Sequence, residues 1–138
     1  EEVVFTRNAT ESLNLLAYSL GRKIIEDGDE IVTTIMEHHS NFVPWQVLAA
    51  EVGATLKVID INDHGYLVIN WDEVITKKTK ILALTYVSNV LGTINPVKEI
   101  VIAAKKINPK ITVGVGNACA SNTRKIWTKH YRSHGKCW

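Results

Sequence analysis

The stretch KILALTYV, residues 80–87, decides the fold that the sequence predicts. Apolar residues run through it without the alternation expected of a strand that faces water on one side. We therefore predict a strand buried on both faces, as in a parallel sheet. On either side of this stretch, short apolar runs alternate with segments of helical periodicity. This alternation predicts an α/β fold, with a mainly parallel sheet flanked by helices.

The other elements follow from local patterns. Further strands are expected near residues 3–6, 30–34, 55–61 and 111–115, where apolar and β-branched residues cluster. Helices are expected to begin near Thr10, Asn41 and Val97, and a short helix is expected around residues 70–76. The second helix should carry Pro44 in its first turn and end at Gly53.

Composition narrows the class of protein. The 138 residues suit one domain, and 46% hydrophobic with 22% charged residues is typical of a globular chain. No run of about 18 apolar residues occurs, so no membrane span is predicted. The chain begins at Glu1 without a secretory pattern or an initiator Met, which favours a fragment or a processed chain. Two cysteines favour a reducing compartment, the cytoplasm or, in a eukaryote, an organelle.

The composition changes near residue 115. Five of the 16 Lys and Arg residues follow it, and none of the 14 Asp and Glu residues does, so the chain before it has 11 positive and 14 negative residues, a net charge of −3. We therefore treat residues 1–115 as one domain and residues 116–138 as a divergent basic tail.

Polar segments follow the predicted strands, where ligands gather in open α/β sheets. In RNATES, residues 7–12, a helix N-terminus and the hydroxyl of Thr10 suit a phosphate, although an ordinary helix capped by Thr10 or Asn8 explains the same residues. In MEHHSN, residues 36–41, a neutral imidazole could stack on an aromatic cofactor or move protons, or both histidines could be surface residues in a loop.

Two more segments occupy equivalent positions. In VSNVLGT, residues 87–93, Asn89 could place its amide against a ligand and Gly92 would let the backbone approach closely; an ordinary Asn/Gly turn is the alternative. Residues 114–120, GVGNACA, form on their own only a glycine-containing turn.

Taken together, three of these segments resemble the cysteine desulfurases of the class V aminotransferase group. They are FTRNATESLN at residues 5–14, MEHHSNFVPWQ at 36–46 and VSNVLGTINP at 87–96, and the likeness runs almost continuously to about residue 115. Their sequences most resemble the subgroup that mobilises sulfur for iron–sulfur clusters and includes selenocysteine lyases. The resemblance implies that residues 1–115 are part of the cofactor-binding large domain of a pyridoxal-phosphate-dependent transferase.

The resemblance also implies a reaction and its residues. The family removes sulfur from L-cysteine or L-selenocysteine, leaves L-alanine, passes an enzyme persulfide to a sulfur-acceptor protein, and acts as a homodimer. Pyridoxal 5'-phosphate supplies the electron sink. By position, Thr10 and the amide of Glu11 would bind the phosphate, His38 would stack on the ring and assist proton transfer, and Asn89 would contact the cofactor or substrate. His39 is expected to pack or face solvent.

The tail departs from the family pattern. Where the family has Asp-Gly-Ala-Gln, with the Asp paired to the pyridine nitrogen, this chain has residues 116–119, GNAC. Residues 131–136, YRSHGK, resemble the family's Ser-Gly-His-Lys with Gly and His reversed, which makes Lys136 a candidate Schiff-base lysine. The alternatives are that this segment is an ordinary basic tail or the product of a shifted reading frame. Neither Cys119 nor Cys137 matches the family's persulfide cysteine. We therefore expect a truncated, inactive desulfurase.

Three alternatives remain open. Cys119, His130, His134 and Cys137 could form a small zinc site, although the spacing from Cys119 is not a common finger pattern. The five tail cations interleaved with Trp127, Tyr131 and Trp138 could contact nucleic acid, which we do not expect without a shaped groove. The chain could also be a folded, non-catalytic remnant whose only activity is association.

Overall fold

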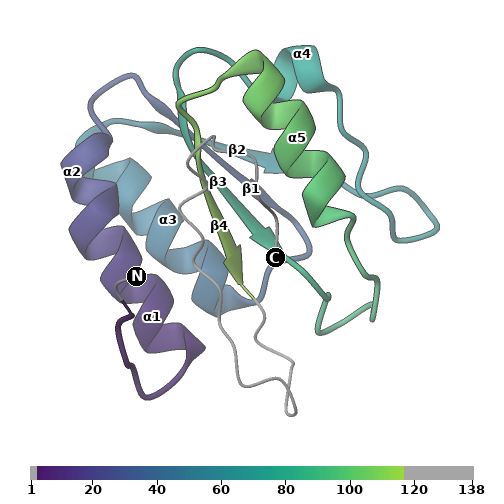
Figure 1. The fold of residues 1–138 in the computed structure, drawn as a ribbon, viewed down its shortest axis with the longest axis horizontal. Helices are drawn as coiled ribbons and strands as arrows, with labels where there is room; N and C mark the ends of the chain where they lie inside the picture. The colour runs from purple at the N-terminus through teal and green to yellow at the C-terminus, as the bar shows by residue number, and fades with distance from the viewer. Residues whose placement is uncertain (1–2, 117–138) are drawn as a thin grey trace.

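The computed structural model describes residues 3–116, and these form a parallel sheet with helices on both faces (Figure 1). The strands are β1 (Glu30–Thr34), β2 (Thr55–Ile59), β3 (Thr79–Thr85) and β4 (Thr112–Gly116), in the order β2-β1-β3-β4. Every pairing between them is parallel. The predicted α/β fold is therefore confirmed.

The stretch that led to this prediction forms the centre of the sheet. All of β3 is buried except Lys80, and it pairs with β1 on one side and β4 on the other. Apolar side chains line both of its faces because helices cover both. Beside it, the register with β1 shifts between Glu30 and Ile31.

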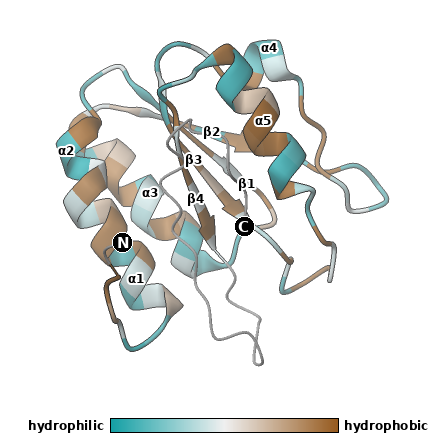
Figure 2. Cartoon of the chain, in the orientation of Figure 1, coloured by the Kyte–Doolittle hydropathy of each residue, from teal (hydrophilic) through white to brown (hydrophobic). Residues whose placement is uncertain are grey.

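One face of the sheet is covered by two long helical segments. The first runs through α1 (Ala9–Leu16), a π-helical turn η1 (Ala17–Gly21) and α2 (Arg22–Ile24); the second is α3 (His39–Val52). The other face carries α4 (Trp71–Val74) and α5 (Val97–Ile107), as Figure 1 shows. Figure 2 shows brown and teal alternating along α5, as expected for a helix with one buried face.

Alternating side chains of the strands divide the core into two clusters. Ile31 of β1 and Ile81 of β3 pack with Trp45 of α3 on one face. Val32 and Leu82, the next residue of each strand, pack with helix α5 on the other face. This alternation follows from the two-residue period of a strand.

The strand expected at residues 3–6 is wrong. These residues form no strand, and the side chains of Val3, Val4 and Phe5 are 70%, 71% and 94% exposed. A strand needs a partner for its backbone, and among the described residues the sheet edges are β2 and β4, neither of which pairs with this segment. Three apolar residues and a β-branched threonine indicate strand propensity but say nothing about a partner.

Helix starts and ends agree with the sequence to within two residues. Helix α3 begins at His39, two residues before the expected start, so Pro44 lies in its second turn. Gly53 ends it in the left-handed region at φ 76°, as predicted. Strand β2 ends at Ile59, and Ile61 instead forms an isolated antiparallel bridge with Leu67.

The predicted basic tail, from residue 117 onward, lies outside the described residues, and so do Lys136 and the four candidate zinc ligands. Within residues 3–116, no helix is long and apolar enough to cross a membrane. The same part of the chain contains no group of three or more His, Cys, Asp or Glu side chains placed to hold a metal ion.

Candidate functional site

The helical segments α1 and α3 start at the same end of the sheet, beyond the carboxyl ends of the strands (Figure 1). They run side by side in the same direction. Arg22 forms an ion pair with Glu51, 29 residues further along the chain. Toward the starts of both segments, a shallow groove between them is lined by residues that include Asn14 and Tyr18 of the first segment and Val43 and Val47 of α3. Thr10 lies one turn before Asn14 and His39 lies one turn before Val43, so both residues lie beyond this groove, at the starts of their helices.

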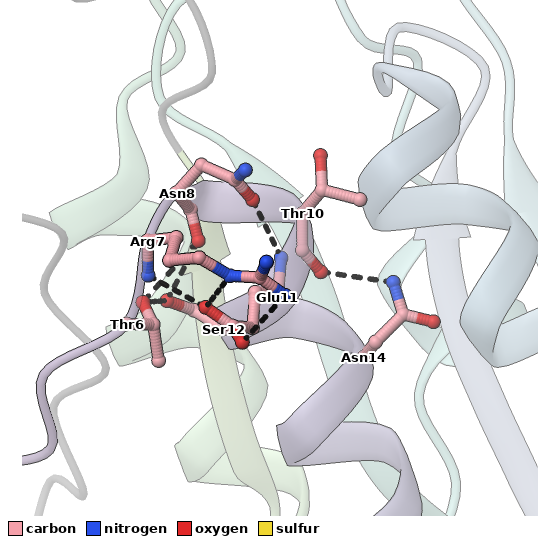
Figure 3. A network of polar contacts seen from close by, with 7 residues as sticks. All are labelled: Thr6, Arg7, Asn8, Thr10, Glu11, Ser12 and Asn14. Carbon is pink, nitrogen blue, oxygen red and sulfur yellow. Dashed lines mark hydrogen bonds and ion pairs between the residues drawn. The ribbon is translucent and has the colours of Figure 1, made fainter.

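The start of α1 is capped by its own side chains, as Figure 3 shows. Asn8 is the N-cap, and its Oδ1 accepts a hydrogen bond of 2.9 Å from the amide of Glu11. The Glu11 carboxylate in turn accepts from the amide of Arg7 at 2.6 Å. The predicted alternative, a cap by Asn8, is thus present. Phosphate binding by the Glu11 amide stays a prediction, and it requires the Asn8 side chain to turn away.

Thr10 remains accessible in this turn. It is exposed, and its backbone carbonyl accepts from the side chain of Asn14 at 2.8 Å. Figure 3 shows its hydroxyl pointing away from the network formed by Thr6, Arg7, Glu11 and Ser12. A hydroxyl at a helix N-terminus, where the partial charge is positive, suits an anionic group.

His38 is the N-cap of α3, and its ring orientation is set by Ser40. The amide of Ser40 donates to Nδ1 at 3.1 Å, and the Ser40 hydroxyl lies 2.8 Å from the same atom. Because Nδ1 accepts the backbone hydrogen bond, the neutral ring carries its proton on Nε2. The side chains of His38 and His39 are both exposed, and their rings are 6.3 Å apart and tilted. The expectation that His39 faces solvent is confirmed.

Asn89 lies on the exposed part of the connection from β3 to α5. This connection folds back on itself: Val87 bridges Ile94, and the amide of Ser88 donates to the carbonyl of Thr93 at 3.0 Å. It leads to α5, which covers the opposite face of the sheet from α3. The contact of Asn89 with the same ligand as His38 stays a prediction.

Glu37 joins the two strand ends to α3. Its Oε1 accepts from the hydroxyl of Thr34 and from the amide of Thr85, both at 2.7 Å. Its Oε2 accepts from the side-chain amide of Asn41 at 2.5 Å. Asn41 continues the chain of hydrogen bonds, since its Oδ1 accepts from Nε1 of the buried Trp45 at 3.2 Å.

The electrostatics of Glu37 are unusual for a glutamate. Burial raises its pKa from 4.5 to about 7, against the hydrogen bonds from Thr34, Asn41 and Thr85, which lower it. Near neutral pH this carboxyl therefore exists in both protonation states. A shifted carboxyl beside candidate cofactor residues is a feature of functional sites.

The end of β4 lies next to the start of α3. A Cβ atom added to Gly116 would lie 3.2 Å from Nδ2 and 3.3 Å from Cγ of Asn41, so this position is packed against α3. The resemblance places the family's pyridine-pairing Asp here. The chain has no carboxylate at this position, and the space that one would take borders Asn41.

Sequence reasoning gave no role to Glu37, Asn41 or Thr85. Their importance comes from contacts between segments 48 residues apart, which no local pattern shows. One pattern in the sequence could have indicated Glu37. A carboxylate between a buried strand and a helix start needs hydrogen-bond donors, because burying it without them costs free energy.

Comparison with known proteins agrees with this geometry. The sequence pattern of the family described as "Aminotransferase class-V" matches residues 1–132. The "Probable cysteine desulfurase" of Synechocystis sp. is 44% identical over 121 residues, covering 87% of this chain and 28% of that protein. The "Cysteine desulfurase" of Serratia proteamaculans is 47% identical over 114 residues, covering 82% of this chain and 28% of the relative. The apo structure of a cysteine desulfurase from Thermococcus onnurineus NA1 superposes with a TM-score of 0.75 at 44% identity, over 83% of this chain and 28% of that one.

Proposed function

Because the chain belongs to the aminotransferase class-V family, we propose that its described part holds pyridoxal 5'-phosphate in a protein of the cysteine desulfurase type. The observation that supports this most strongly is the parallel course of α1 and α3, which puts Thr10 and His38 at helix starts on the same end of the sheet. A phosphate group and an aromatic ring of one small ligand could then meet both helix starts.

The chain spans less than a third of the curated relatives it matches. The activity of a whole protein is therefore part of the proposal: removal of sulfur from L-cysteine or L-selenocysteine, transfer of a persulfide to an acceptor protein, and a homodimeric state. Nothing in the described residues distinguishes the two substrates.

The residues present fit two parts of the cofactor, its phosphate group and its pyridine ring. The exposed Thr10 hydroxyl, pointing away from the capping network, suits the phosphate. The exposed ring of His38, pinned by Ser40, offers a flat face of fixed orientation to the pyridine ring. When bound, pyridoxal phosphate supplies the electron sink for chemistry at an amino acid.

The residues present do not fit the third part of the cofactor, its pyridine nitrogen. A pyridine nitrogen stays protonated beside a carboxylate, and Gly116 provides none where the resemblance expects one. We therefore assign to this chain binding and orientation, and no bond-breaking step.

His38 has a defined part in that arrangement. With Nδ1 accepting from the Ser40 amide, the neutral ring has Nε2–H as its hydrogen-bond donor toward a ligand. Its position as N-cap ties this atom to the first turn of α3. A general acid or base works only from a fixed geometry of this kind.

The proposal is tested by equilibrium dialysis of the 138-residue chain against pyridoxal 5'-phosphate and against pyridoxal. We expect His38→Asn, which keeps an N-cap acceptor but removes the ring, to weaken binding of both compounds by roughly tenfold. Thr10→Val should weaken binding of the phosphorylated compound alone, because it removes only the hydroxyl that meets the phosphate.

His39→Asn is the matched control, since it makes the same change at the neighbouring exposed ring. Its affinity for both compounds should equal that of the wild type. Equal affinities across all four proteins would show that the compound reacts only with scattered lysines, and the proposal would fail.

A further inference from the structure

We propose that Glu37 is a positioning residue that fixes His38 against the carboxyl ends of β1 and β3. The inference deepens the proposed function, because it concerns the residue assigned there to the cofactor ring. It stands on hydrogen bonds that are present without any cofactor.

The first part of the argument is the attachment of Glu37 to the sheet. Its Oε1 accepts from Thr34, at the end of β1, and from the backbone amide of Thr85, at the end of β3. These strands are neighbours in the centre of the sheet. The side chain is therefore tied to the centre of the sheet by two hydrogen bonds of 2.7 Å.

The second part is the attachment of Glu37 to α3. Oε2 accepts from Asn41, and Asn41 accepts from Trp45, which is fully buried in the core between α3 and the sheet. When Glu37 is ionised, the direction of each hydrogen bond in this chain is fixed, because the indole can only donate and the carboxylate can only accept.

Both attachments act on the residue next to His38 in the chain. Glu37 holds the backbone immediately before His38, while Ser40 holds the ring. The helix start and the strand ends are thus locked together on each side of one imidazole. A shift of Glu37 would move the backbone of His38 relative to the Ser40 amide and would break the hydrogen bond to Nδ1.

A single-atom change breaks this pattern. In Glu37→Gln, the new amide group faces the amide group of Asn41, so two donors meet. Rotation of Asn41 by half a turn cures that contact but directs its amide at the indole N–H of Trp45 instead. One mismatch remains in either orientation, and a buried unpaired donor is costly.

A second change should restore the pattern. In the double variant Glu37→Gln with Asn41→Asp, the glutamine amide donates to one oxygen of the new carboxylate at position 41 while Trp45 donates to the other. Donors and acceptors then alternate as in the wild type, and the number of buried charges is unchanged. Asn41→Asp alone places two carboxylates together and should be the worst of the three. Glu51→Gln makes the same change as Glu37→Gln at an exposed site on α3 and serves as the control.

The readout is the pair of imidazole nitrogen signals of His38 in two-dimensional ¹H–¹⁵N spectra of the full chain, without cofactor, at about pH 8.5, where Glu37 is ionised. The wild type and Glu51→Gln should show one tautomer with an unprotonated Nδ1. Glu37→Gln should lose this pattern and approach the averaged signals of exposed His64, and the double variant should regain it. A merely structural role would change stability without this selective exchange and rescue.

A wild-type His38 pattern in Glu37→Gln would overturn the proposal. If that variant does not fold, the double variant decides: recovery of the wild-type signals supports the role, and their absence or a failure to fold refutes it. A separate titration with pyridoxal 5'-phosphate tests the proposed function. If the wild type does not bind the compound, that function fails, while the cofactor-free spectra still decide the role of Glu37.

Discussion

The burial of the Glu37 carboxyl makes the stability of the fold depend on pH. Its hydrogen bonds to Thr34, Thr85 and Asn41 stabilise the ionised form, yet desolvation outweighs them and raises its pKa to about 7. The folded protein therefore binds more protons at this site than the unfolded chain does between pH 4.5 and about 7. Stability present below pH 4.5 is lost as the pH rises through that range.

The change Glu37→Gln should remove this dependence. Between about pH 4.5 and pH 7.5 the free energy of unfolding of the wild type should fall by about 3 kcal/mol more than that of the variant, from roughly 1.36 kcal/mol per pKa unit. Urea denaturation followed by tryptophan fluorescence, at intervals across this range, measures the difference.

Every other titrating group is common to both proteins, so the difference between their pH profiles isolates Glu37. Parallel profiles would mean that this carboxyl titrates alike in the folded and unfolded states, contrary to the effect of its burial.

Individual residues were predicted unevenly from the sequence. His38 and Thr10 could be selected because they follow patterns at element starts, and the structure places both at helix N-termini. Asn8 was recognised only as an alternative cap. Glu37 was missed, because its significance depends on an amide of β3 that arrives 48 residues later.

At the scale of elements, the contact between the first helical segment and α3 depends on Gly21. A Cβ atom added there would lie 2.5 Å from Cδ2 of Leu48 and 3.4 Å from Trp45, both of which are buried. The two helices approach this closely only because Gly21 has no side chain.

Gly21→Val should therefore cost about 2–3 kcal/mol of unfolding free energy, since overpacked cores shift backbone and rotamers. Ser19→Val places the same β-branched residue on the exposed side of the same π-helical turn, and its cost should stay below about 0.5 kcal/mol. Thermal and urea unfolding of both variants make the comparison.

Equal losses in the two valine variants would attribute the effect to helix propensity and argue against a tight helix contact. The π-helical turn itself was not predicted, because the apolar repeat of the first helical segment fits an ordinary α-helix.

Elements with strong local signals were predicted well, and those needing a partner were not. The apolar run of β3 and the glycine that ends α3, Gly53, can each be recognised from the local sequence alone. The segment at residues 3–6 carried only propensity, and it forms no strand. Sequence periodicity therefore predicted which segments are regular better than which segments meet.

For the molecule as a whole, we expect the absence of a carboxylate at Gly116 to limit activity. We expect the 138-residue chain, incubated with pyridoxal 5'-phosphate and L-cysteine, to form alanine no faster than the free cofactor does. Groups that act as a unit in catalysis are not additive, so the loss of one removes most of the effect. Chromatographic assay of alanine against a protein-free blank measures it.

Borohydride reduction and peptide mapping give the complementary result. Adducts spread over surface lysines would agree with a chain that binds the cofactor without activating it. Cysteine-dependent alanine above the blank, together with one reduced adduct at Lys136, would refute this prediction and give the tail a catalytic role.

The central place of β1 has a consequence for the time at which the chain can fold. Strand β1 is the first of the four in sequence, yet it lies between β2 and β3, and Glu30 hydrogen-bonds to Thr79, 49 residues later. During synthesis β1 therefore leaves the ribosome with its β2 partner close behind and its other edge open until β3 emerges. At about 5–20 residues per second, that edge is unprotected for several seconds, an interval in which a chaperone or a second nascent chain can bind it.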